Sequence, residues 1–263
     1  MLRPIRKISR TNLVSFSGID GAGKSTQIEA LRARLEKDGL RVLLIRFWDD
    51  IARLTKLREA TGHRIFKGDT GVGSASAPIN RRDKNVRSWF MTGVRLFLYF
   101  LDAISVRFAV ERALRSEADL VIFDRYIYDE LANLPLRNPA IRAYVWLIMN
   151  LVPKPDISYL LDADPIQARA RKPEYPLDFL QANRHSYLVL RDLAGGMTVI
   201  APMQVKEVER AVLKYALEEL SLKVRLREND GAMSSRDTGS KLARLDRLQT
   251  RPTVFDVTRS SHY

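Results

Sequence analysis

A glycine-rich segment near the start of the chain places the strongest constraint on its fold. It reads Gly18-Ile19-Asp20-Gly21-Ala22-Gly23-Lys24-Ser25, and Thr26 follows. This segment matches the phosphate-binding pattern G-x-x-x-x-G-K-[ST] at every fixed position. In such a loop the glycines let several backbone N–H groups converge on one phosphate, and the next helix directs its positive end there.

The pattern assigns roles to the residues of this loop. We expect Lys24 to reach the β- and γ-phosphates of ATP and the Ser25 hydroxyl to contact Mg²⁺. A glycine-rich turn with a solvated lysine is the structural alternative, and the position of the motif between an apolar run and a helical pattern argues against it. The residues predicted to bind the nucleotide are Gly18, Gly21, Ala22, Gly23, Lys24, Ser25 and Thr26.

Short apolar runs alternate with amphipathic stretches along the chain. Apolar runs without alternation indicate strands buried on both faces, and therefore a parallel sheet. Strands of this kind are expected at 13–16, 42–45, 120–123, 157–161 and 197–200. Helices are expected at 26–38, 92–115, 139–151 and 205–220. The alternation predicts a three-layer α/β domain with right-handed crossovers.

Composition excludes several classes of protein. The 263 residues contain no cysteine, which rules out a disulfide scaffold, an iron–sulfur cluster and a catalytic thiol, and fits a reducing compartment. The most apolar stretch, 140–152, is too short to cross a bilayer of ~30 Å, so no membrane partner is expected.

The net charge of +13 is unevenly distributed. Residues 1–10 and 222–263 each carry +4, whereas residues 11–221 carry +5. We therefore predict a basic N-terminal extension, a phosphate-loop domain over 11–221, and a basic tail over 222–263 that is mostly disordered. The excess charge favours phosphate-bearing partners, although a soluble protein with basic ends is the plain alternative. Residues 61–90, rich in Gly, Ser and basic residues, are expected to form a long functional or mobile loop.

Further segments resemble the thymidylate kinase family across about residues 11–221. The stretch 16–27 is similar to its opening F-E-G-x-D-G-x-G-K-[ST]-T-Q, and Asp124-Arg125-Tyr126 to its D-R-[YFH] signature. The stretch 155–165 resembles its P-D-x-x-x-x-L-D-x-x-P segment. Arg184 and Tyr187 resemble the R-x-x-Y of the following helix.

This resemblance implies a fold and a reaction. The fold is a P-loop kinase domain with a five-stranded parallel sheet flanked by helices, usually in a homodimer. The reaction is transfer of the γ-phosphoryl group from ATP, with Mg²⁺, to a nucleoside monophosphate, with dTMP as the expected acceptor. We accordingly expect a cytoplasmic enzyme of nucleotide biosynthesis that binds nucleotides and does not bind nucleic acid.

The resemblance also implies roles for individual residues. Arg125 would hold the acceptor phosphate, Asp124 would help to hold Mg²⁺, and Asp20 would contact the sugar 3′-hydroxyl. A lid at about 169–178 would supply catalytic positive charge from Arg169, Arg171 or Lys172, of which Arg171 matches the motif. The predicted catalytic residues are Lys24, Arg125 and Arg171. The predicted acceptor-binding residues are Asp20, Arg46, Phe100 and Arg125. The predicted metal ligands are Ser25 and Asp124.

The sequence also departs from the family pattern. Ser17 stands where the family has Glu before the first glycine, and Asp129 stands where it has Ser in x-x-S-x-x-A-Y-Q after the D-R-Y signature. Because these departures fall on acceptor recognition, two alternatives stay open. One is a phosphotransferase for another nucleotide, a nucleoside or a sugar phosphate. The other is a nucleotide-binding regulatory protein without catalysis.

Overall fold

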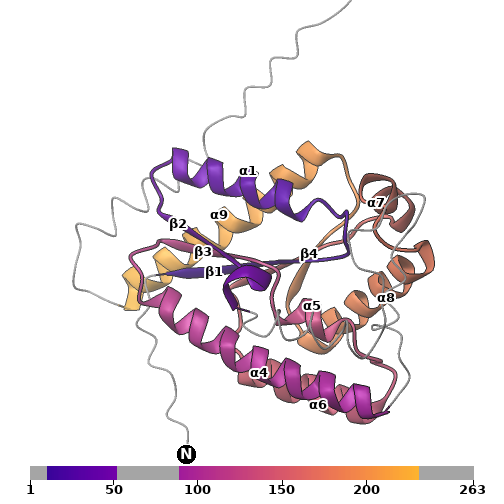
Figure 1. Cartoon of the computed structure of the whole chain (residues 1–263). Helices are drawn as coiled ribbons and strands as arrows, with labels where there is room; N and C mark the ends of the chain where they lie inside the picture. Colours follow the sequence, from indigo (N-terminus) through magenta and orange to yellow (C-terminus); the bar gives the residue numbers. More distant parts are fainter. Residues whose placement is uncertain (1–10, 52–88, 231–263) are drawn as a thin grey trace, which may run out of the picture. The chain divides into compact units, whose positions relative to one another are not determined.

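The computed structural model describes residues 11–51 and 89–230 (Figure 1). The expectations for residues 1–10, for 61–88 of the predicted loop, and for 231–263 lie outside these ranges. The chain divides into two units, Met1–Val212 and Leu213–Tyr263. The described part of the second unit is the C-terminal portion of one helix, α9 (Val205–Asp230), which continues past the predicted domain end at 221.

A parallel sheet of five strands forms the centre of the first unit. Its strands have the order β2-β3-β1-β4-β5, so that β1 is central. They are β1 (Asn12–Ser17), β2 (Val42–Arg46), β3 (Leu120–Asp124), β4 (Ile157–Leu161) and β5 (Met197–Ile200). All five expected strands are confirmed, each within two residues of its predicted ends.

The register aligns the carboxyl ends of three strands. Phe16 on β1 pairs with Asp124 on β3, and Asp124 pairs with Arg46 on β2. The first segment after β1 is the phosphate loop, and the first residue after β3 is Arg125. In open parallel sheets, ligands bind at this edge, where neighbouring connections diverge.

Helices cover both faces of the sheet, as three layers require. Figure 1 shows α1 (Lys24–Lys37) on one face, and α4 (Trp89–Leu114), α5 (Ile127–Leu131) and α6 (Pro139–Leu151) on the opposite face. The remaining helices are α7 (Pro165–Arg171) and α8 (Leu177–Ala194), and a single π-helical turn, η1 (Phe47–Ile51), follows β2. None of the helices in the described ranges is long and apolar enough to cross a membrane.

Three helices, α5, α7 and α8, were not among the helices expected from periodicity, although the family resemblance implied a helix at Arg184 and Tyr187, which lie on α8. The other two, α5 and α7, are short. With five and seven residues they are too short to show a repeating apolar face. Local signals start α7 instead: the Asp164 carboxylate accepts the N–H of Gln167 at 2.9 Å, and Pro165 occupies the first turn. This cap fixes the beginning of the helix that leads into the predicted lid.

Candidate functional site

The phosphate loop connects β1 to α1, and its backbone requires glycine. Gly18, Gly21 and Gly23 have φ values of 143°, 82° and 88°, which L-residues rarely adopt. A Cβ on Gly18 would lie 2.5 Å from the Leu161 carbonyl oxygen, and a Cβ on Gly21 would lie 2.3 Å from that of Ala168. The loop is therefore packed between the end of β4 and α7.

The beginning of α1 is suited to an anion. Gly23 is the N-cap residue, so no capping side chain accepts hydrogen bonds from the first N–H groups of the helix. The first turn of α1 contains no acidic residue. These N–H groups carry the positive end of the helix dipole. Ser25 and Thr26 are exposed in this first turn, as the predicted phosphate and metal contacts require.

Lys24 lies buried inside the loop, with only 6% of its surface exposed. Its Nζ donates hydrogen bonds to the carbonyl oxygens of Gly18 at 2.6 Å and Ile19 at 3.0 Å. Burial, together with the charge of Arg125, lowers the pKa of Lys24 to about 8, although nearby carboxylates oppose this shift. The ammonium group is thus fixed at the inner side of the loop.

Arg125 links the end of β3 to the phosphate loop. Its NH2 group lies 2.5 Å from Oδ1 of Asp20, and its backbone N–H donates to the carbonyl oxygen of Phe16 at 3.1 Å. With φ at 70°, Arg125 is the one non-glycine residue in the described ranges that has a positive φ. Such a conformation costs roughly 1–2 kcal/mol and persists where surrounding contacts enforce it.

The Asp20 carboxylate is held ionised by its neighbours. Burial by itself raises the pKa of Asp20, but the charges of Arg125, Lys24 and Lys172 outweigh it and bring the pKa down to about 2. Burial also lowers the pKa of Arg125, but Asp20 and Asp129 more than compensate, so this pKa lies above its usual value. The structure therefore brings together Asp20, Lys24 and Arg125, all predicted from the sequence.

Asp124 and Arg46 lie at the same edge of the sheet. They are register partners at the ends of β3 and β2. Burial raises the pKa of Asp124 despite the opposing charges of Arg125, Lys24 and Arg46. Arg46 is exposed, and its backbone N–H donates to the Asp50 carboxylate at 2.7 Å.

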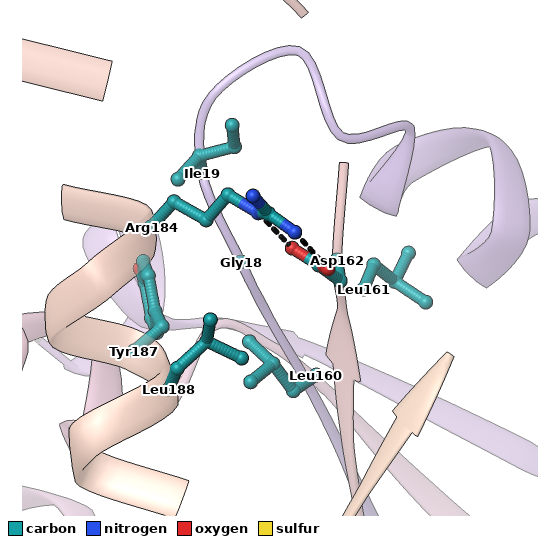
Figure 2. Close-up of a pocket in the computed structure, with 8 residues that line it drawn as sticks. All are labelled: Gly18, Ile19, Leu160, Leu161, Asp162, Arg184, Tyr187 and Leu188. Carbon is teal, nitrogen blue, oxygen red and sulfur yellow. Dashed lines mark hydrogen bonds and ion pairs between the residues drawn. The ribbon is translucent and has the colours of Figure 1, made fainter. Parts of the chain in front are cut away.

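A bidentate ion pair joins the end of β4 to α8. Arg184 donates from Nε and NH2 to the two carboxylate oxygens of Asp162, at 2.6 and 2.7 Å (Figure 2). This pair borders a small surface hollow that is too narrow to enclose a small molecule. The hollow is lined by Gly18, Ile19, Leu160, Leu161, Asp162, Arg184, Tyr187 and Leu188. The pair therefore holds α8 beside the phosphate loop.

The three basic residues of the predicted lid lie at the end of α7. Arg169 and Arg171 occupy its last turn, and Arg171 is exposed. Lys172 pairs with Glu174 at 3.2 Å and is close enough to Asp20 to lower the pKa of that carboxyl. Phe100 lies elsewhere, on α4, where it is 38% exposed, and its stacking role stays a prediction.

A buried polar cluster was not anticipated as part of the site. The carboxylate of Asp129, which is 3% exposed, accepts hydrogen bonds from the hydroxyls of Ser17 and Tyr187, both at 2.7 Å. The available signal was the departure of the sequence from the family pattern at positions 17 and 129. Spacing alone could not show that these two positions meet.

A phosphate loop after the central strand, faced by an arginine from the neighbouring strand, defines a P-loop kinase of the nucleoside-monophosphate type. The chain is 30% identical over 225 residues to the thymidylate kinase of Bifidobacterium longum strain DJO10A, a match that covers 79% of this chain and 98% of that protein. The chain belongs to the thymidylate kinase family.

A second curated relative carries the same family name. The probable thymidylate kinase of Pyrobaculum aerophilum is 30% identical over 210 residues, covering 74% of this chain and 91% of that protein. A crystal structure of thymidylate kinase from Ehrlichia chaffeensis is 20% identical, with a TM-score of 0.49, and the match covers 78% of this chain and 98% of that chain. No protein-family model matches this sequence.

Proposed function

We propose that this protein transfers the γ-phosphoryl group of ATP to dTMP and so forms dTDP and ADP. The observation that carries the proposal is the ion pair between Arg125 and Asp20, because it supports a role for the Arg125 guanidinium beside the phosphate loop. Relatives that carry the name thymidylate kinase support dTMP as the acceptor.

The donor site in this proposal is the phosphate loop. The N–H groups at the start of α1 bind phosphate oxygens of ATP, together with Gly21, Ala22, Gly23 and the Thr26 hydroxyl. Lys24 moves from the carbonyl oxygens of Gly18 and Ile19 to the β- and γ-phosphates. This exchange keeps the ammonium group hydrogen-bonded throughout, so its burial is compensated at each stage.

The residues at the site fit Mg²⁺. Ser25 is exposed at the start of α1, and Asp124 supplies a carboxylate at the end of β3. Within residues 11–51 and 89–230 no three His, Asp or Glu side chains cluster as a complete protein-made metal site. A pair of protein oxygens is the donor set that suits Mg²⁺, which keeps its remaining positions for water and phosphate. When bound, Mg²⁺ neutralises charge on the phosphates.

The acceptor site lies at the ends of β3 and β2. The Arg125 guanidinium binds the dTMP phosphate, because its planar fork can donate two parallel hydrogen bonds. Asp20 orients Arg125 and contacts the sugar 3′-hydroxyl, and Arg46 adds positive charge from the neighbouring strand. Phe100 stacks on the base. These roles are supported by the family motifs and, for Asp20, Arg125 and Arg46, by their positions at one edge of the sheet.

The lid supplies the remaining positive charge. Phosphoryl transfer requires positioning and neutralisation of charge more than covalent assistance. We assign the catalytic lid cation to Arg171, which matches the motif and carries an exposed side chain at the end of α7. Lys172 is the alternative within the same lid, since its charge acts on Asp20.

Large exposed apolar side chains on α4 and α6 support the homodimer. Phe97 and Phe108 on α4 are 62% and 65% exposed, and Trp146 and Leu147 on α6 are 64% and 53% exposed. α4 and α6 contact each other, so these side chains belong to neighbouring helices. Large exposed apolar groups of this kind indicate an interface. Analytical ultracentrifugation of the wild-type protein should give the mass of a dimer. The double variant Phe108→Ser and Trp146→Ser should give the mass of a monomer. A wild-type monomer at micromolar concentration contradicts the assignment.

Product analysis tests the reaction. Purified protein, ATP, Mg²⁺ and dTMP should yield ADP and dTDP in equal amounts, resolved by chromatography and identified by mass. ADP formed without dTDP would show hydrolysis instead of transfer and would refute the proposal.

A further inference from the structure

The buried carboxylate of Asp129 accepts three hydrogen bonds. Oδ2 accepts from the Ser17 hydroxyl at 2.7 Å and from the Tyr126 backbone N–H at 3.1 Å. Oδ1 accepts from the Tyr187 hydroxyl at 2.7 Å. A buried charge is tolerated when several donors satisfy it, and removal of such a charge leaves those donors unpaired.

The three donors come from three parts of the site. Ser17 directly precedes Gly18, the first glycine of the phosphate loop. Tyr126 directly follows Arg125, which has the unusual positive φ. Tyr187 lies on α8, one turn after Arg184, which pairs with Asp162. The Asp129 carboxylate therefore connects three elements: the beginning of the phosphate loop, the turn that contains Arg125, and helix α8.

The charge of Asp129 also acts on the two basic groups of the site. Its electrostatic effect raises the pKa of Lys24 and the pKa of Arg125. Lys24 and Arg125 repel each other, since the charge of Arg125 contributes to lowering the pKa of Lys24. A carboxylate near both offsets this repulsion and lets two cations remain close to the proposed path of the phosphoryl group.

Positions 17 and 129 are the two departures from the family pattern noted above. That pattern has an acid at the position of Ser17 and a serine at the position of Asp129. The structure shows that the two side chains hydrogen-bond directly, with Ser17 fully buried. Relative to that pattern, the acid and the hydroxyl have exchanged positions between β1 and α5, and in this chain they form one hydrogen-bonded pair.

We propose that Asp129 is a positioning residue for phosphoryl transfer, which holds Arg125 in register with the phosphate loop through the exchanged pair with Ser17. The proposal rests on the proposed function for its kinetic consequence. Because only 3% of its surface is exposed, Asp129 acts through Ser17, Tyr126 and Tyr187 and not on the substrate directly. Its loss should therefore change the rate of transfer beyond any effect on folding.

The first test compares two Asp→Asn variants. Asp129→Asn keeps the shape of the side chain but removes its charge, and kcat should fall at least tenfold at saturating ATP and dTMP. The matched control is Asp156→Asn, because the Asp156 carboxylate also accepts a backbone N–H, from Leu13 at 2.7 Å, but at the opposite end of β1. The control should lower the melting temperature and leave kcat within twofold of the wild type. A folded Asp129→Asn variant with kcat within twofold of wild type overturns the proposal.

The second test reverses the exchange. Ser17→Glu places two carboxylates against each other, and Asp129→Ser leaves the hydroxyls without an acid, so each variant should lose at least tenfold in kcat. The double variant re-forms a carboxylate–hydroxyl pair and should recover at least fivefold over the poorer single variant. A double variant whose losses in kcat and in melting temperature simply add refutes the exchange.

The wild-type assay separates the two claims. If the wild-type chain forms no dTDP, the proposed function and the kinetic role of Asp129 are both contradicted. The exchanged pair is then still tested by whether the double variant recovers the melting temperature. Wild-type activity without recovery in the double variant contradicts the pair alone.

Discussion

The guanidinium of Arg125 lies 2.5 Å from the carboxylate of Asp20, and this ion pair joins the end of β3 to the phosphate loop. The backbone of Arg125 has a φ of 70°. A non-glycine residue keeps this conformation only where the surrounding contacts enforce it. Both side chains are mostly buried, with exposures of 24% and 15%. The pair therefore orients the proposed acceptor-binding group before the dTMP phosphate arrives.

Removal of the Asp20 charge should lower the free energy of unfolding at neutral pH and weaken its dependence on pH in acid. The folded state lowers the pKa of Asp20 from 3.8 to about 2, so the carboxylate contributes stability above pH 4 that is lost as the pH falls towards 2. Asp20→Asn should lower the free energy of unfolding at pH 7 by about 2 kcal/mol and flatten the fall in stability below pH 4. Urea unfolding at pH 7, 4 and 2.5 measures both effects.

The control for Asp20→Asn is Asp192→Asn. Asp192 pairs with Arg191 at the surface, where both side chains are at least 40% exposed. Exposed pairs contribute about 0–1 kcal/mol, so this variant should remain close to wild type. Equal losses in the two variants would contradict the strong coupling of Asp20 to Arg125.

Gly21→Ala should displace α7 from the phosphate loop. The new Cβ would lie 2.3 Å from the Ala168 carbonyl oxygen, and that oxygen belongs to rigid backbone. Hydrogen exchange of residues 165–172 should therefore accelerate, and stability should fall by more than the roughly 1–2 kcal/mol of a left-handed alanine.

Gly23→Ala separates the clash from the backbone strain. Gly23 has nearly the same φ as Gly21, 88° against 82°, but a Cβ there would meet nothing within 4 Å. Stability should fall by the cost of the backbone conformation alone, and exchange in 165–172 should stay at the wild-type rate. If both variants accelerate exchange equally, α7 does not pack on the loop through Gly21.

Lys24→Ala should abolish most of the transfer. The loss of a group that neutralises the transferring phosphates commonly costs 10²–10³-fold, so kcat should fall at least a hundredfold. Circular dichroism should still show a folded chain. Lys37→Ala, at the exposed end of the same helix, is the matched control and should retain wild-type turnover. Unchanged dTMP phosphorylation by Lys24→Ala would refute the donor site.

Two variants in the lid assign its catalytic cation. Arg171→Ala should lower kcat by about a hundredfold with the KM for dTMP near wild type, because the interaction is made in the transition state. Lys172→Ala should cost less than tenfold, since Lys172 is 44% exposed and paired with Glu174. The reverse order of effects would move the catalytic role to Lys172.

The sheet and the phosphate loop were predictable because their signals are local. Strands such as β1 and β4 are buried at every position, so their apolar runs appear directly in the sequence. The phosphate loop is a contiguous motif in which the required glycines occupy fixed positions. The short helices α5 and α7 could not be predicted in this way, since their starts depend on single side chains such as Asp164.

The contacts across the site required the structure. Arg125 and Asp20 are 105 positions apart in the sequence, and Ser17 and Asp129 are 112 positions apart. At such separations no helix or strand periodicity indicates that the two residues of a pair are in contact. Each residue could be singled out from the sequence: Asp20 and Arg125 match motifs of the thymidylate kinase family, and Ser17 and Asp129 depart from them. Only the register of β1 with β3 brings the two pairs together.

The central claim is the transfer of phosphate to dTMP, and the most direct measurement is the acceptor preference. The values of kcat/KM should be determined with ATP and Mg²⁺ for dTMP, other nucleoside monophosphates, thymidine and sugar phosphates, with each product identified by mass. The account predicts that dTMP has the highest kcat/KM by at least tenfold and that dTDP is its product. A higher kcat/KM for any other acceptor, or no turnover of dTMP, would contradict it.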